Sequence, residues 1–266
     1  MTASTTLSRS LRYAESEVIA YRRTWRGTVI TSFINPVFFL AAMGAGLGSL
    51  VDDGTGQPLS ISYLTFVASG LMAASAMQNG AGDGSFPVMA GIKWRKNFHG
   101  TITTPLGPAD IIWGRLIWGV GRLLFVLLVF AIIAVLFGAL DLGPALASIP
   151  PAVLTGVAFT TSITAWTLTQ KDDRSLSTLF RFLIVPLFLF SGTFFPISQL
   201  PDWLEPVAYV TPLFHGVELV RKFALPGVDE SIITGIPTWV HFAYLVVMAA
   251  VGLYFSIRLL DSRIRE

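Results

Sequence analysis

Stretches of mostly apolar residues, each long enough for a membrane-crossing helix, constrain the fold of this chain more than any other feature. Such a helix needs about 20 apolar residues, and its backbone groups must pair within the segment because lipid offers them no partner. Six stretches qualify, at about residues 28–50, 60–82, 110–138, 149–170, 177–197 and 236–259. The sequence therefore predicts an all-α integral membrane protein with six transmembrane helices, in one membrane domain over residues 1–266.

Composition excludes the other broad classes of protein. Charged residues make up 13% of the chain and hydrophobic residues 53%, whereas a soluble domain has about 25% charged residues. A soluble chain of this composition would expose a large apolar area to water. The basic residues lie between the apolar stretches and form no single patch, so the net charge of +2 does not indicate a nucleic-acid partner. Cysteine is absent, which excludes disulfides, thiolate metal sites and cysteine nucleophiles.

Residues 7–26 have the pattern of an amphipathic helix and lack the apolar core of a signal peptide. Apolar side chains recur at spacings of three and four, as on one face of a helix: Leu7, Leu11, Ala14, Val18, Tyr21 and Trp25. The arginines of this segment lie mainly off that face. We expect the helix to lie in the membrane interface. The alternative is a leader that packs against the rest of the protein.

The distribution of Lys and Arg predicts the orientation in the membrane. With six spans and a cytoplasmic N-terminus, 15 of the 18 basic residues fall on the cytoplasmic side. Only Arg221 and Lys222 fall outside, and Arg122 lies within a span. Cytoplasmic segments carry an excess of basic residues in membrane proteins. We therefore expect a multi-pass protein of the inner (cytoplasmic) membrane with both termini in the cytoplasm.

The connection at residues 83–109 is cytoplasmic by this argument and carries a short aromatic and basic segment. Its central part, residues 92–104, is predicted to be a helix with Trp94 and Phe98 on one side. Basic residues surround these aromatic rings: Lys93, Arg95 and Lys96. Such a helix either seats in a groove of a soluble partner or anchors the next span at the interface.

The connection at residues 191–235 is predicted to lie outside, yet it is too apolar for a solvated loop. Prolines divide it into short pieces, with helices expected near 202–209 and 212–224. Irregular backbone at membrane depth requires cover from protein or a water-filled cavity. We therefore interpret residues 198–228 as an outer re-entrant segment that closes one end of the bundle.

Arg122 is the ionisable residue that stands out within a span, since no acidic residue falls clearly in the middle of one. A charge at membrane depth is costly and marks a functional candidate, although a long arginine side chain also reaches toward the membrane surface. His215 and Glu218 are three residues apart, which is too few ligands for a metal site. No metal site is therefore expected.

Three groups of residues carry a family resemblance. They are Thr104-Pro105-Leu106 with Asp110 and Gly114-Arg115; Ser191-Gly192-Thr193-Phe194-Phe195-Pro196 with Leu200-Pro201 and Trp203-Leu204; and Pro212-Leu213 with Glu218 and Arg221. On these residues, and in the order of its spans, nearly the whole chain resembles the membrane subunit of an ABC-2 type exporter. The nodulation lipo-oligosaccharide and daunorubicin-resistance permeases are the most similar branch. Gly107-Pro108 departs from the family pattern at the start of the third span.

The resemblance implies a division of labour between chains. Two membrane subunits, as a homodimer or a heterodimer, would pair above two ABC ATPase subunits, which bind ATP and Mg; this chain would hold no cofactor. The residues expected to couple to the ATPase are Lys93, Trp94, Arg95, Lys96, Phe98, Thr104, Pro105 and Leu106. Those expected at an outer gate are Phe194, Phe195, Pro196, Pro201, Trp203 and Pro212. The absence of a GxxxxGK[ST] phosphate loop agrees with this division.

The leading hypothesis is therefore a transport subunit, not an enzyme, of an ATP-driven exporter. Its substrate would be amphiphilic: a glycolipid, a lipid-linked saccharide or a hydrophobic drug, moved out of the cytoplasm or inner leaflet. An ion-gradient-driven transporter or channel is the first alternative. A membrane-embedded lipid enzyme is the second, and it lacks the cluster of acids, histidines or nucleophiles that such chemistry needs.

Overall fold

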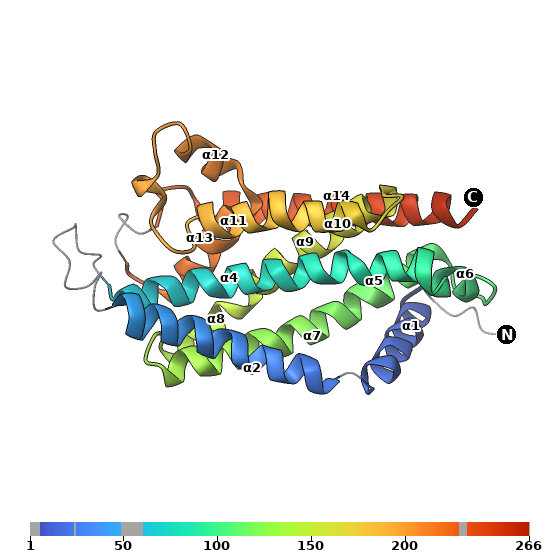
Figure 1. Cartoon of the computed structure of the whole chain (residues 1–266), viewed down its shortest axis with the longest axis horizontal. Helices are drawn as coiled ribbons and strands as arrows, with labels where there is room; N and C mark the ends of the chain where they lie inside the picture. Colours follow the sequence, from blue (N-terminus) through green and yellow to red (C-terminus); the bar gives the residue numbers. More distant parts are fainter. Residues whose placement is uncertain (1–5, 24, 49–60, 229–232, 266) are drawn as a thin grey trace.

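The protein is a bundle of long helices lying side by side, and its computed structural model describes residues 6–23, 25–48, 61–228 and 233–265 (Figure 1). All regular elements in these ranges are helical. The first part of the chain forms α1 (Thr6–Tyr21), α2 (Trp25–Ala41), η1 (Ala42–Gly48), α4 (Tyr63–Gly84), α5 (Phe86–Met89), η2 (Ala90–Trp94), α6 (Asn97–Thr101) and α7 (Pro108–Leu136). The second part forms α8 (Leu142–Ala147), α9 (Ile149–Thr169), α10 (Arg174–Leu179), η3 (Phe180–Ile184), α11 (Val185–Phe190), η4 (Ile197–Gln199), α12 (Glu205–Val210), α13 (Pro212–Ala224) and α14 (Thr238–Arg265).

The all-α membrane fold is confirmed, while the exact count of six spans stays a prediction. Within the described ranges, four helical segments are long and apolar enough to cross a membrane: Trp25–Gly44, Pro108–Leu136, Leu142–Thr169 and Thr238–Arg265. The other two expected spans correspond to α4 and to the continuous run α10–η3–α11, which lie alongside these helices (Figure 1). Positions 49, 50 and 60, at the edges of two expected spans, lie outside the described residues.

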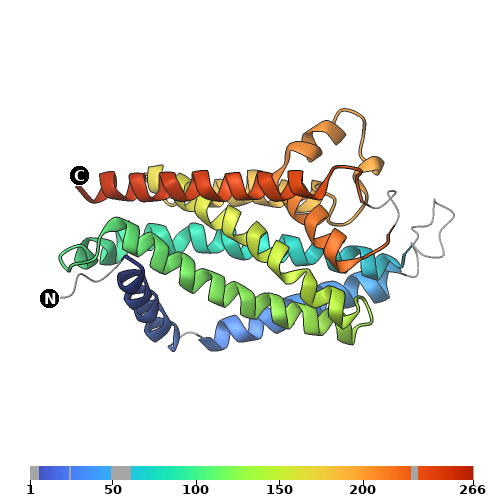
Figure 2. The ribbon, with the colours of Figure 1, turned by 180° about the vertical axis from the view of Figure 1, so that it is seen from behind.

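Helix α4 lies at the centre of the bundle, which explains its many small residues. It is buried along most of its length, and both views show it between α7 and α14 (Figures 1 and 2). Helix α9 crosses the bundle diagonally and meets α4 at Gly80. A Cβ atom on Gly80 would stand 2.3 Å from the carbonyl oxygen of Gly156. Inside a membrane the hydrophobic effect does not drive helices together. Close packing of helix backbones through small residues stabilises their association instead.

This crossing gives a first testable prediction, made on Gly80→Leu. The new side chain meets the backbone of α9, which cannot move without separating the two helices, so we expect destabilisation by about 1–3 kcal/mol. The matched control is Gly82→Leu, since no atom lies within 4 Å of a Cβ at Gly82. Thermal unfolding of the purified chain in detergent measures both. Equal melting temperatures for the two variants would show that α4 and α9 do not cross here.

Helix α1 leaves the bundle at an angle and packs on the first turns of α7 (Figure 2). Arg9 lies 3.2 Å from Asp110, and Glu17 lies 3.6 Å from Arg115. On the same side of α1, burial raises the pKa of Tyr13. Leu7 and Leu11 remain exposed. The helix therefore packs against protein on one side, as a leader would, and presents apolar residues on the other, as an interfacial helix would.

Candidate functional site

A group of polar side chains lies between α2, α4 and α7, at the middle of the bundle. We call it the polar strip: Asn35, Ser75, Gln78, Asn79, Asp83 and Arg122. Several of its members line two small adjoining cavities of about 50 and 120 Å³. Asn35, Ser75 and Asn79 border both cavities, and Arg122 borders the larger one.

The residues of the polar strip lie near the middle of long helices, where a membrane protein normally exposes apolar side chains. Arg122 lies fourteen residues from each end of α7, and Gln78 lies near the middle of the run from Tyr63 to Trp94. Asn35 and Gln78 are nevertheless exposed, and Asn79 is half-buried. Polar groups facing the hydrocarbon core without partners cost several kcal/mol each. This face of the bundle is therefore suited to water or to another polar surface, and not to lipid.

Arg122 is paired with an acidic side chain, although the sequence predicts no acidic residue clearly in the middle of a span. Its guanidinium donates to the Asp83 carboxylate over 2.5 Å, and each side chain is about a fifth exposed. The sequence predicts Asp83 in the connection at residues 83–109, whereas α4 continues through Gly84 and carries Asp83 into the bundle. Arg115 also donates to the backbone carbonyl of Asp83, over 3.0 Å. The pair thus joins α4 to α7 at depth.

The connection between α4 and α7 is shorter than predicted and its helix is broken. The chain continues helically from α5 through η2 to Trp94, turns at Lys96, where φ is 51°, and resumes in α6. Trp94 and Phe98 therefore do not share one helical side: Trp94 is half exposed, whereas Phe98 is fully buried. The exposed residues form a continuous run that we call the docking turn: Lys93, Trp94, Arg95, Lys96 and Asn97.

Beside the docking turn lies a groove of about 330 Å³ between α1, α5, η2, α6 and α7. Its walls include Glu17, Phe86, Trp94 and Arg115. Beneath it, Phe98 packs in an apolar cluster with residues of α5, α7, α9 and α14, and the Arg115 guanidinium lies 5.6 Å from the centre of its ring. Phe98 is thus a support for this surface and not part of it.

Thr104, Pro105 and Leu106 form the turn that leads into α7. The Thr104 hydroxyl donates to the Thr101 carbonyl and accepts from the backbone N–H of Leu106. The chain then enters α7 at Gly107, whose backbone N–H donates to the Asp110 carboxylate over 2.9 Å. A carboxylate in the first turn stabilises the start of a helix. Gly107 and Pro108 therefore fit the start of α7, since proline suits the first helical position.

At the opposite end of the bundle, Arg221 holds the Ser191–Pro196 turn in place. Its guanidinium is buried, donates to the Gly192 carbonyl over 2.6 Å and lies 3.8 Å from the centre of the Phe66 ring. Gly192 has a φ of +83°, which favours glycine. One side chain of α13 therefore ties this turn to α4.

The residues expected at an outer gate all lie at this end, but in different environments. Pro196 is buried and Phe194 and Phe195 are partly buried, whereas Pro201 and Trp203 are exposed. The Phe194 ring meets Phe188 at 5.0 Å between centroids. Pro212 begins α13, which covers residues 212–224 as predicted, while α12 begins at Glu205, three residues later than expected.

Two further polar contacts brace this end. Glu218 accepts hydrogen bonds from the backbone N–H and the hydroxyl of Thr234, at 2.8 and 2.7 Å. Tyr209 donates to Glu205 over 2.8 Å, and partial burial together with that carboxylate raises the pKa of Tyr209 to about 12. Its hydroxyl therefore stays protonated and donating at physiological pH.

His215 does not pair with Glu218; its Nδ1 lies 2.9 Å from Nδ1 of His241 on α14. Among the described residues no group of three or more His, Cys, Asp or Glu side chains is placed to hold a metal ion.

Comparison with known proteins decides the family. The family model described as "ABC-2 type transporter" matches residues 13–225, which is most of the chain. The chain belongs to the ABC-2 type transporter family. Related proteins align with nearly the full length of this chain. Nodulation protein J of Sinorhizobium fredii is 27% identical over 251 residues, covering 92% of this chain and 90% of that protein. Nodulation protein J of Bradyrhizobium diazoefficiens is 27% identical over 248 residues, with the same coverage. The Inner membrane transport permease YadH of Escherichia coli is 23% identical over 231 residues, covering 87% and 86%.

As a member of the ABC-2 type transporter family, this chain is a membrane transport subunit. Arg122 is recognisable in the sequence as a candidate, whereas the rest of the polar strip was not predicted. Asn35, Gln78 and Asn79 lie within apolar stretches of the sequence and could have indicated it. Uncharged amide side chains at such positions also need polar partners that lipid does not provide. Which residues contact an ATPase, and which act as a gate, stays a prediction.

Proposed function

We propose that this chain is the membrane subunit of an ATP-driven exporter, and that the polar strip lines the path of an amphiphilic substrate. The polar strip is the observation that carries the proposal. Exposed amides and a partly exposed ion pair lie at mid-depth on one side of the bundle, while apolar side chains of the same helices remain exposed beside them. A polar headgroup and an apolar tail would each find suitable surroundings along such a face.

The proposed partners follow from the same geometry. Lipid does not suit the polar strip, so a second membrane subunit would complete the path, as a homodimer or a heterodimer. The docking turn would seat on one of two ATPase subunits, which hold the ATP and Mg. Its exposed Trp94, flanked by Lys93 and Arg95, has the aromatic and basic character common in interface hot spots.

The contacts of α1 offer a route for motion from the ATPase to the path. Ion pairs hold α1 to the first turns of α7 at Asp110 and Arg115. Fourteen residues into α7, Arg122 holds Asp83 of α4. A displacement of α1 and the docking turn would therefore act on the two helices that carry most of the polar strip.

An expected loss of partner binding tests this proposal. Trp94→Ala is predicted to reduce copurification of the ATPase subunit about tenfold, as expected for a hot-spot residue. The matched control is Trp239→Ala at the opposite end of the bundle, where the side chain is even more exposed. We expect it to leave copurification unchanged. Absence of any nucleotide-binding subunit from the native complex would contradict the proposal, as would equal losses in both variants.

The Arg122–Asp83 pair also favours one alternative, an ion-gradient-driven transporter. Ionisable groups at mid-membrane are typical of proton and ion pathways. Reconstituted vesicles separate the two: the exporter needs ATP and its ATPase subunit, whereas the alternative transports substrate on a proton or sodium gradient alone.

A further inference from the structure

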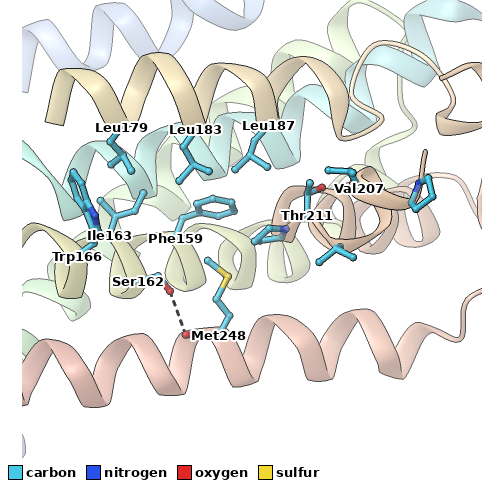
Figure 3. Close-up of a pocket in the computed structure, with 13 residues that line it drawn as sticks. Phe159, Ser162, Ile163, Trp166, Leu179, Leu183, Leu187, Val207, Thr211 and Met248 are labelled. Atoms are coloured by element: carbon cyan, nitrogen blue, oxygen red, sulfur yellow. Dashed lines mark hydrogen bonds between the residues drawn. The ribbon is translucent and has the colours of Figure 1, made fainter. Parts of the chain in front are cut away.

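A large apolar cavity shares no lining residue with the two cavities of the polar strip. It has a volume of about 700 Å³ and lies between α9, the run α10–η3–α11, α12 and α14 (Figure 3). Leu179, Leu183 and Leu187 form one wall, and Phe159 and Trp166 of α9 face them. Its volume falls within the range of about 300–1,000 Å³ found for ligand pockets.

The cavity offers few polar partners to a water molecule. Its lining is almost wholly apolar, and both hydroxyls in it already have partners. Ser162 donates to the Met248 carbonyl over 3.4 Å, and Thr211 donates to the Ala208 carbonyl over 2.7 Å. A buried water needs two to four polar partners. An occupant must therefore be apolar.

The cavity is continuous with the surface that faces lipid. Leu183, Val207 and Val210 line it and are exposed at the same time. Met248 lines both this cavity and a shallower apolar hollow of about 490 Å³ along the outer side of α14. In a membrane-embedded chain, a hollow that opens through apolar exposed residues opens toward acyl chains.

The shape and ends of the cavity indicate how a lipid would enter. Leu179 to Leu187 span eight residues of helix, or about 12 Å at the rise of an α-helix. Trp166 lies three residues from the end of α9, a position typical of the membrane interface. Just beyond it, Lys171, Asp172, Asp173 and Arg174 are all exposed. Lys93 pairs with Asp172 over 3.0 Å, and Arg263 donates to the carbonyls of Leu168 and Gln170. Four basic groups therefore gather here around two acidic ones, which leaves positive charge at the level expected for an inner-leaflet headgroup.

We propose that this cavity binds an acyl chain of an anionic inner-leaflet phospholipid, with the headgroup at the Lys171 and Arg174 end. The site is separate from the polar strip and does not depend on ATP or on an exported substrate. The bound chain fills the space between the run α10–η3–α11 and α14 and so holds this run against the bundle.

Native mass spectrometry of the purified, delipidated complex tests the proposal, with dioleoylphosphatidylglycerol added as the probe. One lipid per membrane subunit is expected to remain bound after detergent dilution. Val207→Trp fills the cavity mouth and should weaken retention about tenfold. The matched control is Ile132→Trp on α7, because Val207 and Ile132 are 55% and 53% exposed and Ile132 does not line this cavity. Dioleoylphosphatidylcholine should be retained less.

Photolabelling the unmodified protein keeps the test valid if a variant misfolds. A phosphatidylglycerol with a diazirine in its acyl chain should still label the segments around Leu183 and Val207 after detergent dilution, and no longer label Ile132. Equal retention in both variants, label lost equally from both surfaces, or retention of an exported amphiphile but not of phospholipid would each overturn the proposal. None of these results would affect copurification of the ATPase, so failure here is distinguishable from failure of the proposed function.

Discussion

Replacing Arg122 with alanine is expected to reduce ATP-dependent transport strongly while leaving the complex assembled. The substitution leaves the Asp83 carboxylate without its partner in the middle of the bundle. Loss of one member of a fully buried pair costs about 3–5 kcal/mol. Since each side chain is about a fifth exposed, we expect about 2 kcal/mol. Transport assays in vesicles with the ATPase subunit should show a reduction of about tenfold or more.

Exchanging the two charged residues tests whether transport depends on the ion pair itself or on one of the two side chains alone. Arg122→Asp combined with Asp83→Arg restores the pair in reverse, and part of the transport lost in each single variant should return. Arg181→Ala, which removes an exposed arginine of η3, is the control and should transport normally. If Arg122→Ala transports as well as the unaltered chain, the polar strip is not the path.

Replacing Arg221 with methionine is expected to cause the largest loss of stability of any single change considered. The guanidinium is buried between the Gly192 carbonyl and the Phe66 ring. Its removal frees the Ser191–Pro196 turn and leaves a buried carbonyl without its donor, at a cost of about 3 kcal/mol or more. Arg221→Lys should restore little, because an ammonium group does not reproduce a planar group stacked on an aromatic ring.

Thermal unfolding in detergent measures this effect, and the neighbouring Lys222 supplies the control. Lys222 donates to the Ile236 carbonyl from a half-buried position, so Lys222→Met should cost only about 1 kcal/mol. A melting temperature of Arg221→Met equal to that of Lys222→Met would show that Arg221 does not hold this end of the bundle together.

The sequence predicted the helical membrane fold and its elements well, for a clear physical reason. Long apolar stretches allow one solution in lipid, so the positions of α2, α7, α9 and α14 follow from hydropathy. Helix α13 could be predicted from its amphipathic pattern, since its apolar face is buried in the bundle. Helix α4 was predicted in place, although its small and polar residues keep it from being among the four segments that are apolar enough to cross a membrane.

The arrangement of the candidate site could be predicted only in part. Asp83 lies among Gly80, Gly82 and Gly84, which hid the continuation of α4 and therefore the pairing of Asp83 with Arg122. The spacing of four residues predicted Trp94 and Phe98 on one side of a single helix, because the sequence does not reveal the turn at Lys96. Likewise, Arg221 was assigned to an outer segment by charge counting, and its contact with Phe66, more than 150 positions earlier, depends on tertiary packing.

The absence of cysteine makes one measurement especially direct, since a single introduced cysteine is the only reactive thiol in the chain. In the reconstituted complex, Gln78→Cys in the polar strip is predicted to react with a hydrophilic, membrane-impermeant thiol reagent. Its rate should change when ATP is added, while Ile132→Cys on the lipid-facing side of α7 should stay unreactive. A Gln78→Cys that is inert with and without ATP, or that reacts no faster than Ile132→Cys, would contradict the claim that an ATP-driven path runs along this face.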